Sequence, residues 1–236
     1  DIEVVLTGNT YQAAFTESSP VSTFNSGNQI LLNASGSLQI DNRILTYMDN
    51  QWKAENEFSW SDLTGKTNVT AVYPVYPDLD YVQENLYKNN SLEDILYVKD
   101  EFPAGNSIHL QFKHLFSLLT LHLEGNLQTY FQKIEVTCPA VSSIIPKSAE
   151  IVLADNGTHT TTIAQVSPSG NYSFIVPPVG NMLIAINMVT NGKKYTTQLE
   201  TKSFTGNKEY TYHLKISEKT PGIMTAEDWI AFSQLI

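Results

Sequence analysis

The five histidines are the side chains of this chain best suited to metal or acid–base chemistry, and they stand at positions 109, 114, 122, 159 and 213. No two of them lie four residues apart in a helical pattern, and no H-E-x-x-H motif occurs. His114 and His122 fall on one face of an expected strand, but a straight strand would hold them roughly 26 Å apart. The spacing therefore predicts no metal site. It predicts that His114 is a structural residue in a core or at a domain interface.

The acidic and nucleotide-type motifs do not form a catalytic set. Asp78, Asp80 and Glu84 lack the glycine and the later glutamate of a calcium loop, which favours a solvated acidic loop. Gly65-Lys66-Thr67 ends like a phosphate-binding loop, but Trp60 occupies the position of its first glycine. No G-x-S-x-G motif is present. We therefore expect no enzyme and no cofactor. A small glycosidase stays as the enzymatic alternative and would need two carboxylates in one cleft.

Aromatic residues offer a different chemistry, the stacking of sugar rings. Tyr76, Tyr81 and Tyr87 are the candidate glycan-contact residues, with Trp52 as a further platform. Ordinary core packing of the same rings is the competing interpretation. The single cysteine, Cys138, lies in a strand-like run that ends at Pro139, and we expect a buried structural thiol there.

Charge is distributed unevenly along the 236 residues, whose net charge of −10 disfavours nucleic acid and anionic lipid as partners. The whole of the acidic excess lies in residues 1–105, and residues 106–236 carry equal numbers of acidic and basic side chains. The asymmetry predicts an acidic N-terminal domain over residues 1–105 and a second domain over residues 106–236, with a terminal tail at 217–236. No signal peptide and no apolar run long enough to span a bilayer is visible.

The elements that must position these side chains are strands. Short alternating runs, rich in Tyr, Phe, Thr and Val, are separated by turn signals at Asn156-Gly157, Ser169-Gly170, Asn191-Gly192 and Gly206-Asn207. This pattern predicts an all-β, mostly antiparallel sandwich or barrel with hairpins at those signals. Residues 78–98 are weakly periodic and predict a long loop with one short helix.

The segment from Ile108 to Leu123 changes its buried face. Ile108, Leu110 and Phe112 alternate with polar residues, as in a half-buried strand, and the later leucines then occupy the opposite parity. Because a strand cannot exchange its buried face without a bulge, a bend or burial on both sides, we expect this segment to pass between two packing environments.

Four short motifs, in order along the chain, resemble those of the fimbrillin-like family, the type V pilus subunits of Bacteroidales that include FimA-like and Mfa-like proteins. They are the AVYPVYP run at residues 71–77, DILY at 94–97, FKHLFSLL at 112–119 and IMTAEDW at 223–229. The resemblance implies two tandem β-sandwich domains of transthyretin-like topology. It also implies export as a lipoprotein precursor to the outer membrane, where the subunit joins a fimbrium.

The resemblance further implies that subunits join by donor-strand exchange, in which a neighbour's strand fills a sheet edge. The candidate donor is the tail at residues 222–236, whose apolar side chains are Ile223, Trp229, Ile230, Phe232 and Leu235. Thr225 and Asp228 also resemble a helix capping box, so a docked helix is equally open and would indicate a tip or accessory subunit. The implied partners are other pilus subunits. Host or bacterial surface proteins or glycans are the candidate ligands. A surface glycan-binding protein is the alternative function.

Processing by an arginine-specific protease, as in well-known members of that family, fits this chain poorly. Its sole arginine is Arg43, which lies inside an expected strand, so cleavage there would remove structural residues.

Overall fold

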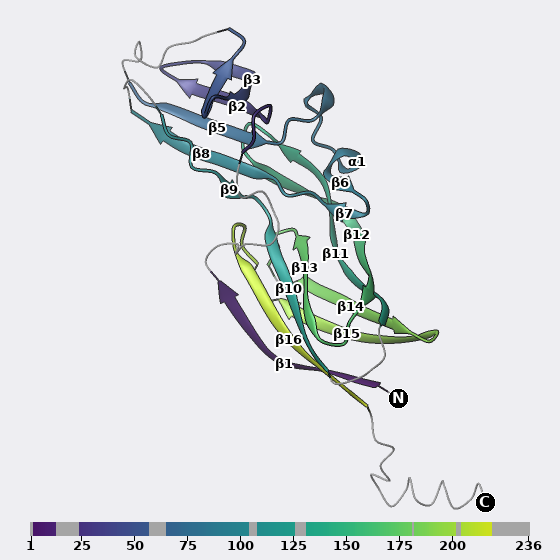
Figure 1. Cartoon of the computed structure of the whole chain (residues 1–236). Coiled ribbons are helices and arrows are strands. Elements are labelled where there is room, and N and C mark those ends of the chain that lie inside the picture. Colours follow the sequence, from purple (N-terminus) through teal and green to yellow (C-terminus); the bar gives the residue numbers. More distant parts are fainter. Residues whose placement is uncertain are drawn as a thin grey trace, which may run out of the picture.

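The computed structural model describes residues 2–12, 24–56, 65–103, 108–125, 131–180, 182–201 and 204–218. Within these ranges the chain is almost entirely β-strand, arranged in several sheets (Figure 1). Every strand pairing except that of β10 with β16 is antiparallel among the described residues. The prediction of an all-β, mostly antiparallel sandwich-type fold is confirmed.

Two four-stranded sheets form a sandwich at the lower end of Figure 1. The first sheet has the order β1 (Ile2–Gln12), β16 (Glu209–Glu218), β10 (Ser117–Gly125) and β13 (Gly170–Val176). The second has the order β12 (Glu150–Val166), β11 (Phe131–Ile145), β14 (Met182–Thr190) and β15 (Lys193–Thr201).

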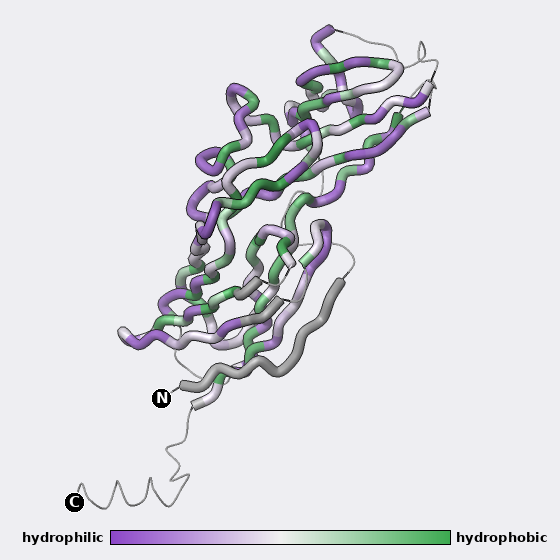
Figure 2. The backbone as a smooth tube through the Cα atoms, turned by 180° about the vertical axis from the view of Figure 1, so that it is seen from behind, coloured by the Kyte–Doolittle hydropathy of each residue, from purple (hydrophilic) through white to green (hydrophobic). Residues whose placement is uncertain are grey.

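Strand alternation builds the core between these two sheets. Every second side chain of β10 and β16 points inward and is buried, namely Leu119, Leu121, Leu123, Tyr210, Tyr212, Leu214 and Ile216. The facing sheet contributes Ile134, Val136, Ile184, Ile186 and Met188. A period of two places all of these on one face of their strands, and their burial removes a large apolar area from water. Figure 2 shows the apolar stretches along the inner strands and polar ones in the turns.

A six-stranded sheet forms the other end of the molecule. Its order is β4 (Gln51–Ala54), β3 (Ile40–Met48), β2 (Gln29–Gly36), β5 (Thr67–Tyr73), β8 (Leu96–Phe102) and β9 (Lys113–His114). Both faces of this sheet are covered. Ile30 and Leu32 pack in one core, while Leu31, between them in sequence, packs in a second core with Val141 and Ile144 of β11.

The predicted loop at residues 78–98 carries more structure than expected. It contains the 3₁₀ turn η1 (Pro77–Leu79), the single-turn helix α1 (Gln83–Leu86) and a small hairpin of β6 (Tyr87–Lys88) and β7 (Ser91–Leu92). The predicted short helix is therefore present. The hairpin was missed because its turn is Asn89-Asn90, both at positive φ, rather than an Asn-Gly pair.

The segment from Ile108 to Leu123 does pass between packing environments. Ile108, Leu110 and Phe112 cover one face of the six-stranded sheet, Leu115 and Phe116 enter the second core, and the leucines of β10 enter the sandwich core. The expected ladder over residues 108–112 is absent, since pairing with β8 begins only at Lys113. Apolar residues therefore alternate in residues 108–112 because this segment packs on the face of the sheet, and not because it forms a strand.

The hairpin predictions were correct at one turn signal of four. Asn191-Gly192 joins β14 to β15, which pair with each other. Ser169-Gly170 and Gly206-Asn207 instead lead into strands of the opposite sheet. Asn156-Gly157 lies inside β12, where five residue steps oppose two on β11 and produce a large bulge. A residue that tolerates positive φ permits a change of direction, but it does not determine which sheet receives the next strand.

Two strand pairings cross the predicted domain boundary at residue 105, as does the isolated bridge between Val82 and Ser143. β1 bonds to β16 of the sandwich, and β9 bonds to β8 of the six-stranded sheet. The second core also contains side chains from both sides of this boundary. The assignment of residues 1–105 and 106–236 to two domains remains a prediction. In these pairings β1, from the first range, joins a sheet of the second range, and β9, from the second range, joins a sheet of the first.

Candidate assembly site

β1 forms the edge of its sheet and comes from the opposite end of the chain to its partner, β16. The two strands are antiparallel from Ile2 opposite Glu218 to Gln12 opposite Glu209, with a bulge between Leu6 and Gly8. β1 also contacts β15 of the facing sheet. It therefore lies along the side of the sandwich where the two sheets meet, as Figure 1 shows for the purple and yellow strands.

The strand beneath this edge, β16, presents a row of backbone groups toward β1 and buried side chains toward the core. Tyr210, Tyr212, Leu214 and Ile216 of β16 are between 0% and 4% exposed with β1 in place. The N–H and C=O groups on the β1 side of β16 are satisfied by β1 alone among the described strands. A sheet edge of this kind binds any strand of suitable alternation, through ladder bonds and side chains placed in alternate pockets.

The start of β16 is fixed to β10 by contacts that do not involve β1. The rings of Phe204 and Tyr210 stack with their centroids 4.1 Å apart and their planes 6° apart. The Thr205 N–H donates to the Tyr210 hydroxyl at 2.9 Å, and the Ser117 hydroxyl donates to the Thr205 carbonyl at 2.9 Å. Gly206 approaches the Leu115 carbonyl so closely that a Cβ there would lie 2.5 Å from its oxygen. β16 and β10 are thus held together independently of the edge strand.

His114 lies where the two ends of the molecule meet. Its Nδ1 is 2.9 Å and 3.1 Å from the two carboxylate oxygens of Asp94, and its backbone N–H donates to Asn207 Oδ1 at 3.1 Å. The Asp94 side chain is 5% exposed and that of His114 is 16% exposed. This junction of β9, the loop before β8 and the turn before β16 agrees with the structural role predicted for His114.

The three candidate glycan tyrosines have different surroundings. Tyr76 and Tyr81 are 5% and 3% exposed, and their rings pack edge to face in the second core. Their hydroxyls donate to Glu93 and to the Pro74 carbonyl, both at 2.7 Å. Burial raises the pKa of both phenols, strongly for Tyr76, where the Glu93 carboxylate adds to the effect. Because stacking on a sugar needs an exposed ring face, these positions favour the core-packing interpretation for Tyr76 and Tyr81.

Tyr87 is half-buried, and its ring lies against that of His159 with the centroids 4.0 Å apart. Its hydroxyl accepts the Val141 N–H at 2.9 Å. Burial is the main cause of the raised pKa of this phenol. Tyr87 therefore ties the β6–β7 hairpin to the long β11–β12 pair, and of the three tyrosines it alone is not fully buried.

A polar groove of about 460 Å³ lies on the six-stranded sheet beside the β11–β12 turn. Its lining includes Asn33, Asp41, Asp100 and Lys147. Asn33 is 6% exposed; its Oδ1 accepts the Asn42 N–H at 2.9 Å, and its Nδ2 has no hydrogen-bond partner among the described residues. An unpaired buried donor costs free energy. Because this Nδ2 has almost no accessible surface, the open lining of the groove comes from its other side chains.

Cys138 is 7% exposed in the sandwich core, and burial raises the pKa of its thiol to about 12. The predicted burial of this thiol is confirmed, and the raised pKa disfavours the thiolate form needed for reactivity. Arg43 lies in the middle of β3, as predicted. None of the helices in the described ranges is both long enough and apolar enough to cross a membrane.

The side chains proposed as donor residues, Ile223, Trp229, Ile230, Phe232 and Leu235, lie outside the described residues. A group that sequence reasoning did not bring together is His122, Glu124 and His213, whose potential metal-ligating atoms lie within 4.8 Å of one another. No sequence spacing indicated it, because His122 and His213 are adjacent only through the parallel pairing of β10 with β16.

Comparison with known proteins places the chain in a family. The model of the family described as fimbrillin-like matches residues 19–229. The chain belongs to the fimbrillin-like family. Membership identifies it as a pilus or adhesion subunit at the cell surface, a structural rather than an enzymatic class of protein.

Solved structures of similar fold come from Bacteroides. A candidate cell adhesion protein from Bacteroides uniformis has a TM-score of 0.60 and 13% identity, over 84% of this chain and 89% of that protein. Another from Bacteroides ovatus has a TM-score of 0.56 and 14% identity, over 84% and 88%. At these identities the likeness supports the fold alone. A search of curated proteins finds no match.

Proposed function

We propose that this fimbrillin-like chain is a structural and adhesive pilus subunit that joins its neighbours by donor-strand exchange at the β16 edge. The observation that carries the proposal is the position of β1, an edge strand from one end of the chain that completes a sandwich made otherwise of residues 117–218. A strand supplied by a second subunit has the same ladder bonds and pockets available to it.

The independent attachment of β16 to β10 supports this proposal. Strand exchange needs a platform that survives the loss of the edge strand. The Phe204–Tyr210 stack and the hydrogen bonds of Thr205 supply such contacts without β1. The tail at residues 222–236 is the proposed donor. By analogy with the family, we further propose export as a lipoprotein precursor and a location in the fimbrium at the outer membrane.

The route by which β1 leaves is constrained by sequence. Residues 13–28, between β1 and β2, contain no lysine or arginine, and the first basic residue is Arg43 inside β3. Trypsin-like cleavage would therefore cut a strand of the six-stranded sheet. We propose that β1 is displaced by the incoming strand or released by a protease of different specificity.

The test uses the full chain with a site-specific protease sequence inserted between residues 13 and 23. After cleavage, a synthetic peptide of residues 219–236 is added, and binding is followed by native mass spectrometry and thermal unfolding. We expect one peptide per chain and recovery of the thermal midpoint lost on cleavage. A peptide of residues 2–12 is the positive control, and a scrambled tail peptide is the negative control.

Each outcome of this experiment has a separate meaning. Rebinding of residues 2–12 without binding of the tail peptide would reject the tail as donor while keeping the edge as a strand-binding site. Failure of both peptides, with the cleaved protein still folded by circular dichroism, would reject the edge itself.

Glycan binding is the second candidate function, and the polar groove supports it better than Tyr76 or Tyr81 does. The carboxylates of Asp41 and Asp100 in its lining are acceptors suited to sugar hydroxyls. On a glycan array, Asp100→Ala should lose binding, because it removes one of these exposed carboxylates from the groove. Loss with Tyr87→Ala instead would locate the site at that ring, and an array without hits would reject the function.

A further inference from the structure

A second potential site lies on the outer face of the sheet that contains β1. His122 and Glu124 are two residues apart on β10 and therefore point to the same side, opposite to the buried Leu121 and Leu123. His213 of β16 stands directly opposite His122 in the parallel register. These three side chains are partly exposed, at 36% for His122, 50% for Glu124 and 31% for His213.

Two of the three distances within this group match those of a metal site, and all three ligand atoms lie within 4.8 Å of one another. Glu124 Oε1 lies 3.4 Å from His122 Nε2 and 3.3 Å from His213 Nδ1. In a tetrahedron with bonds of about 2.0–2.2 Å, neighbouring ligand atoms are about 3.3–3.6 Å apart. Two of the three separations thus already have the required length. The rings of His122 and His213 lie side by side, with their centroids 4.9 Å apart.

A hydrogen bond from a third strand orients His122. Its Nδ1 bonds to Oδ1 of Asn171 on β13, directly opposite it in the register. Because an amide oxygen only accepts, Nδ1 carries the proton, and in neutral His122 the Nε2 lone pair then faces the Glu124 carboxylate. Two acceptors facing each other repel, and a cation between them removes the repulsion. Metal-binding histidines are commonly held by such a bond at the other ring nitrogen.

We propose that His122, Glu124 and His213 bind a divalent transition-metal ion of the zinc type, with a fourth position open to water. Two imidazoles and one carboxylate suit Zn²⁺, Ni²⁺ or Cu²⁺ rather than Ca²⁺ or Mg²⁺, which require mainly oxygen ligands. The ion links β10 to β16, the strand on which β1 lies. Gly8 is opposite His213 in the register of β1 and has no side chain to cover it.

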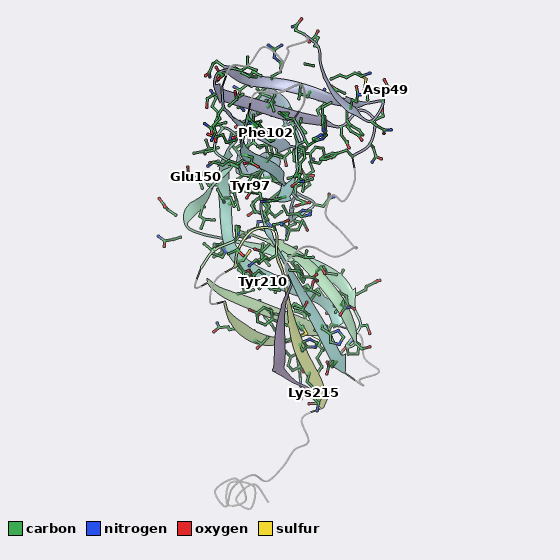
Figure 3. The ribbon with its side chains drawn as sticks, turned by 90° about the vertical axis from the view of Figure 1, so that its left-hand side faces the viewer. Asp49, Tyr97, Phe102, Glu150, Tyr210 and Lys215 are labelled. Atoms are coloured by element: carbon green, nitrogen blue, oxygen red, sulfur yellow. The ribbon has the colours of Figure 1, made fainter. Side chains whose placement is uncertain are left out.

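The competing explanation is an ordinary cross-strand contact between a protonated histidine, His122 or His213, and the Glu124 carboxylate. Lys215 stands opposite Glu124 in the register, near the lower end of β16 in Figure 3, and is the neighbouring cation along the strand. This explanation predicts no specific zinc binding. The two explanations are therefore separable by a direct titration.

The test is calorimetric titration of untagged full-length protein with ZnCl₂ near pH 7.5, repeated with CaCl₂ and MgCl₂. We expect one Zn²⁺ per chain, a higher thermal midpoint with zinc, and no response to calcium or magnesium. His122→Ala, His213→Ala and Glu124→Gln should each weaken zinc binding at least tenfold. Asn171→Ala should weaken it about tenfold, the lower end of the range for such supporting residues.

Matched controls keep this result specific. His159→Ala removes a histidine elsewhere on the surface, and Lys215→Gln removes the neighbouring cation; both should retain zinc binding at wild-type affinity or better. Thermal unfolding without zinc checks that each variant is folded. Absence of zinc binding to the wild type, or equal binding by the folded His122→Ala and His213→Ala variants, would overturn the proposal. Neither result bears on strand exchange, which does not depend on the metal.

Discussion

The six-stranded sheet and the sheet that contains β1 are completed in different ways. Four adjacent strands of the six-stranded sheet, β4 to β5 in spatial order, come from one continuous stretch of chain, residues 29–73. The sheet that contains β1 combines residues 2–12, 117–125, 170–176 and 209–218. Its edge strand joins a partner at the far end of the chain.

This difference bears directly on assembly. A strand between two neighbours in a continuous sheet is held by short connections and by two ladders, so its replacement would disrupt the sheet. β1 has one ladder and lies at an edge, and its partner remains tied to β10 without it. The comparison therefore predicts that the edge of the sandwich opens at lower free-energy cost than the six-stranded sheet.

The largest expected effect comes from the core beneath β1. Leu214→Ala should lower the free energy of unfolding by about 2–5 kcal/mol, because Leu214 is completely buried in β16. Urea unfolding measures this loss. Hydrogen exchange should in addition accelerate in residues 2–12 beyond the change expected from global stability.

Leu31→Ala is the matched control, since Leu31 is equally buried in the six-stranded sheet. It should cost a similar free energy without selectively accelerating exchange in β1. Equal acceleration of β1 in both variants would contradict the comparison and show that the edge opens only with global unfolding.

A smaller effect is expected at the junction between the two regions. His114→Ala should cost about 1–3 kcal/mol, because it removes a partner from the buried Asp94 carboxylate. The exposed His109 provides the control, and His109→Ala should change stability by no more than about 0.5 kcal/mol. If the junction couples the two regions, thermal unfolding of His114→Ala should separate into two transitions, whereas a single sharp transition would argue against that coupling.

The parts of this fold that follow from local sequence were predictable. Alternation identified β14 and β15, and Asn191-Gly192 correctly joined them, because a two-residue turn at positive φ constrains adjacent strands. The burial of the β10 leucines followed from the same period of two. The family resemblance extended this to the class of protein, which local patterns alone did not supply.

The pairings between distant segments could not be predicted in this way. Nothing local to β1 indicates that it bonds to β16, about two hundred residues later, because the ladder uses backbone groups that every residue carries. The same reason hid the group of His122, Glu124 and His213, which depends on a parallel register across some ninety residues. At Asn156-Gly157 the turn signal was real, but continuous pairing with β11 on either side turned the expected hairpin into a bulge.

The smallest expected effect concerns the ion pair between Lys147 and Asp41, which joins the β11–β12 turn to β3 at 2.6 Å. The hydrogen bond from Lys147 holds the pKa of Asp41 below its ordinary value of 3.8, with a further contribution from Gln39. A lowered pKa means that the pair stabilises the fold above that value and loses its effect as the pH falls through the folded-state pKa. Both side chains are more than half exposed, so salt should screen the effect.

Lys147→Ala should therefore raise the pKa of Asp41 toward 3.8, as followed by NMR titration, with only a slight fall in thermal midpoint at neutral pH and none at high salt. Lys53→Ala breaks a similar pair with Asp49, but within one hairpin, and should change the pKa of Asp49 without affecting Asp41. If the pKa of Asp41 is the same in Lys147→Ala as in the wild type, the turn does not rest on β3 in solution. The two regions would then be joined mainly by the buried contacts of the second core and of His114, and the polar groove would lose one wall.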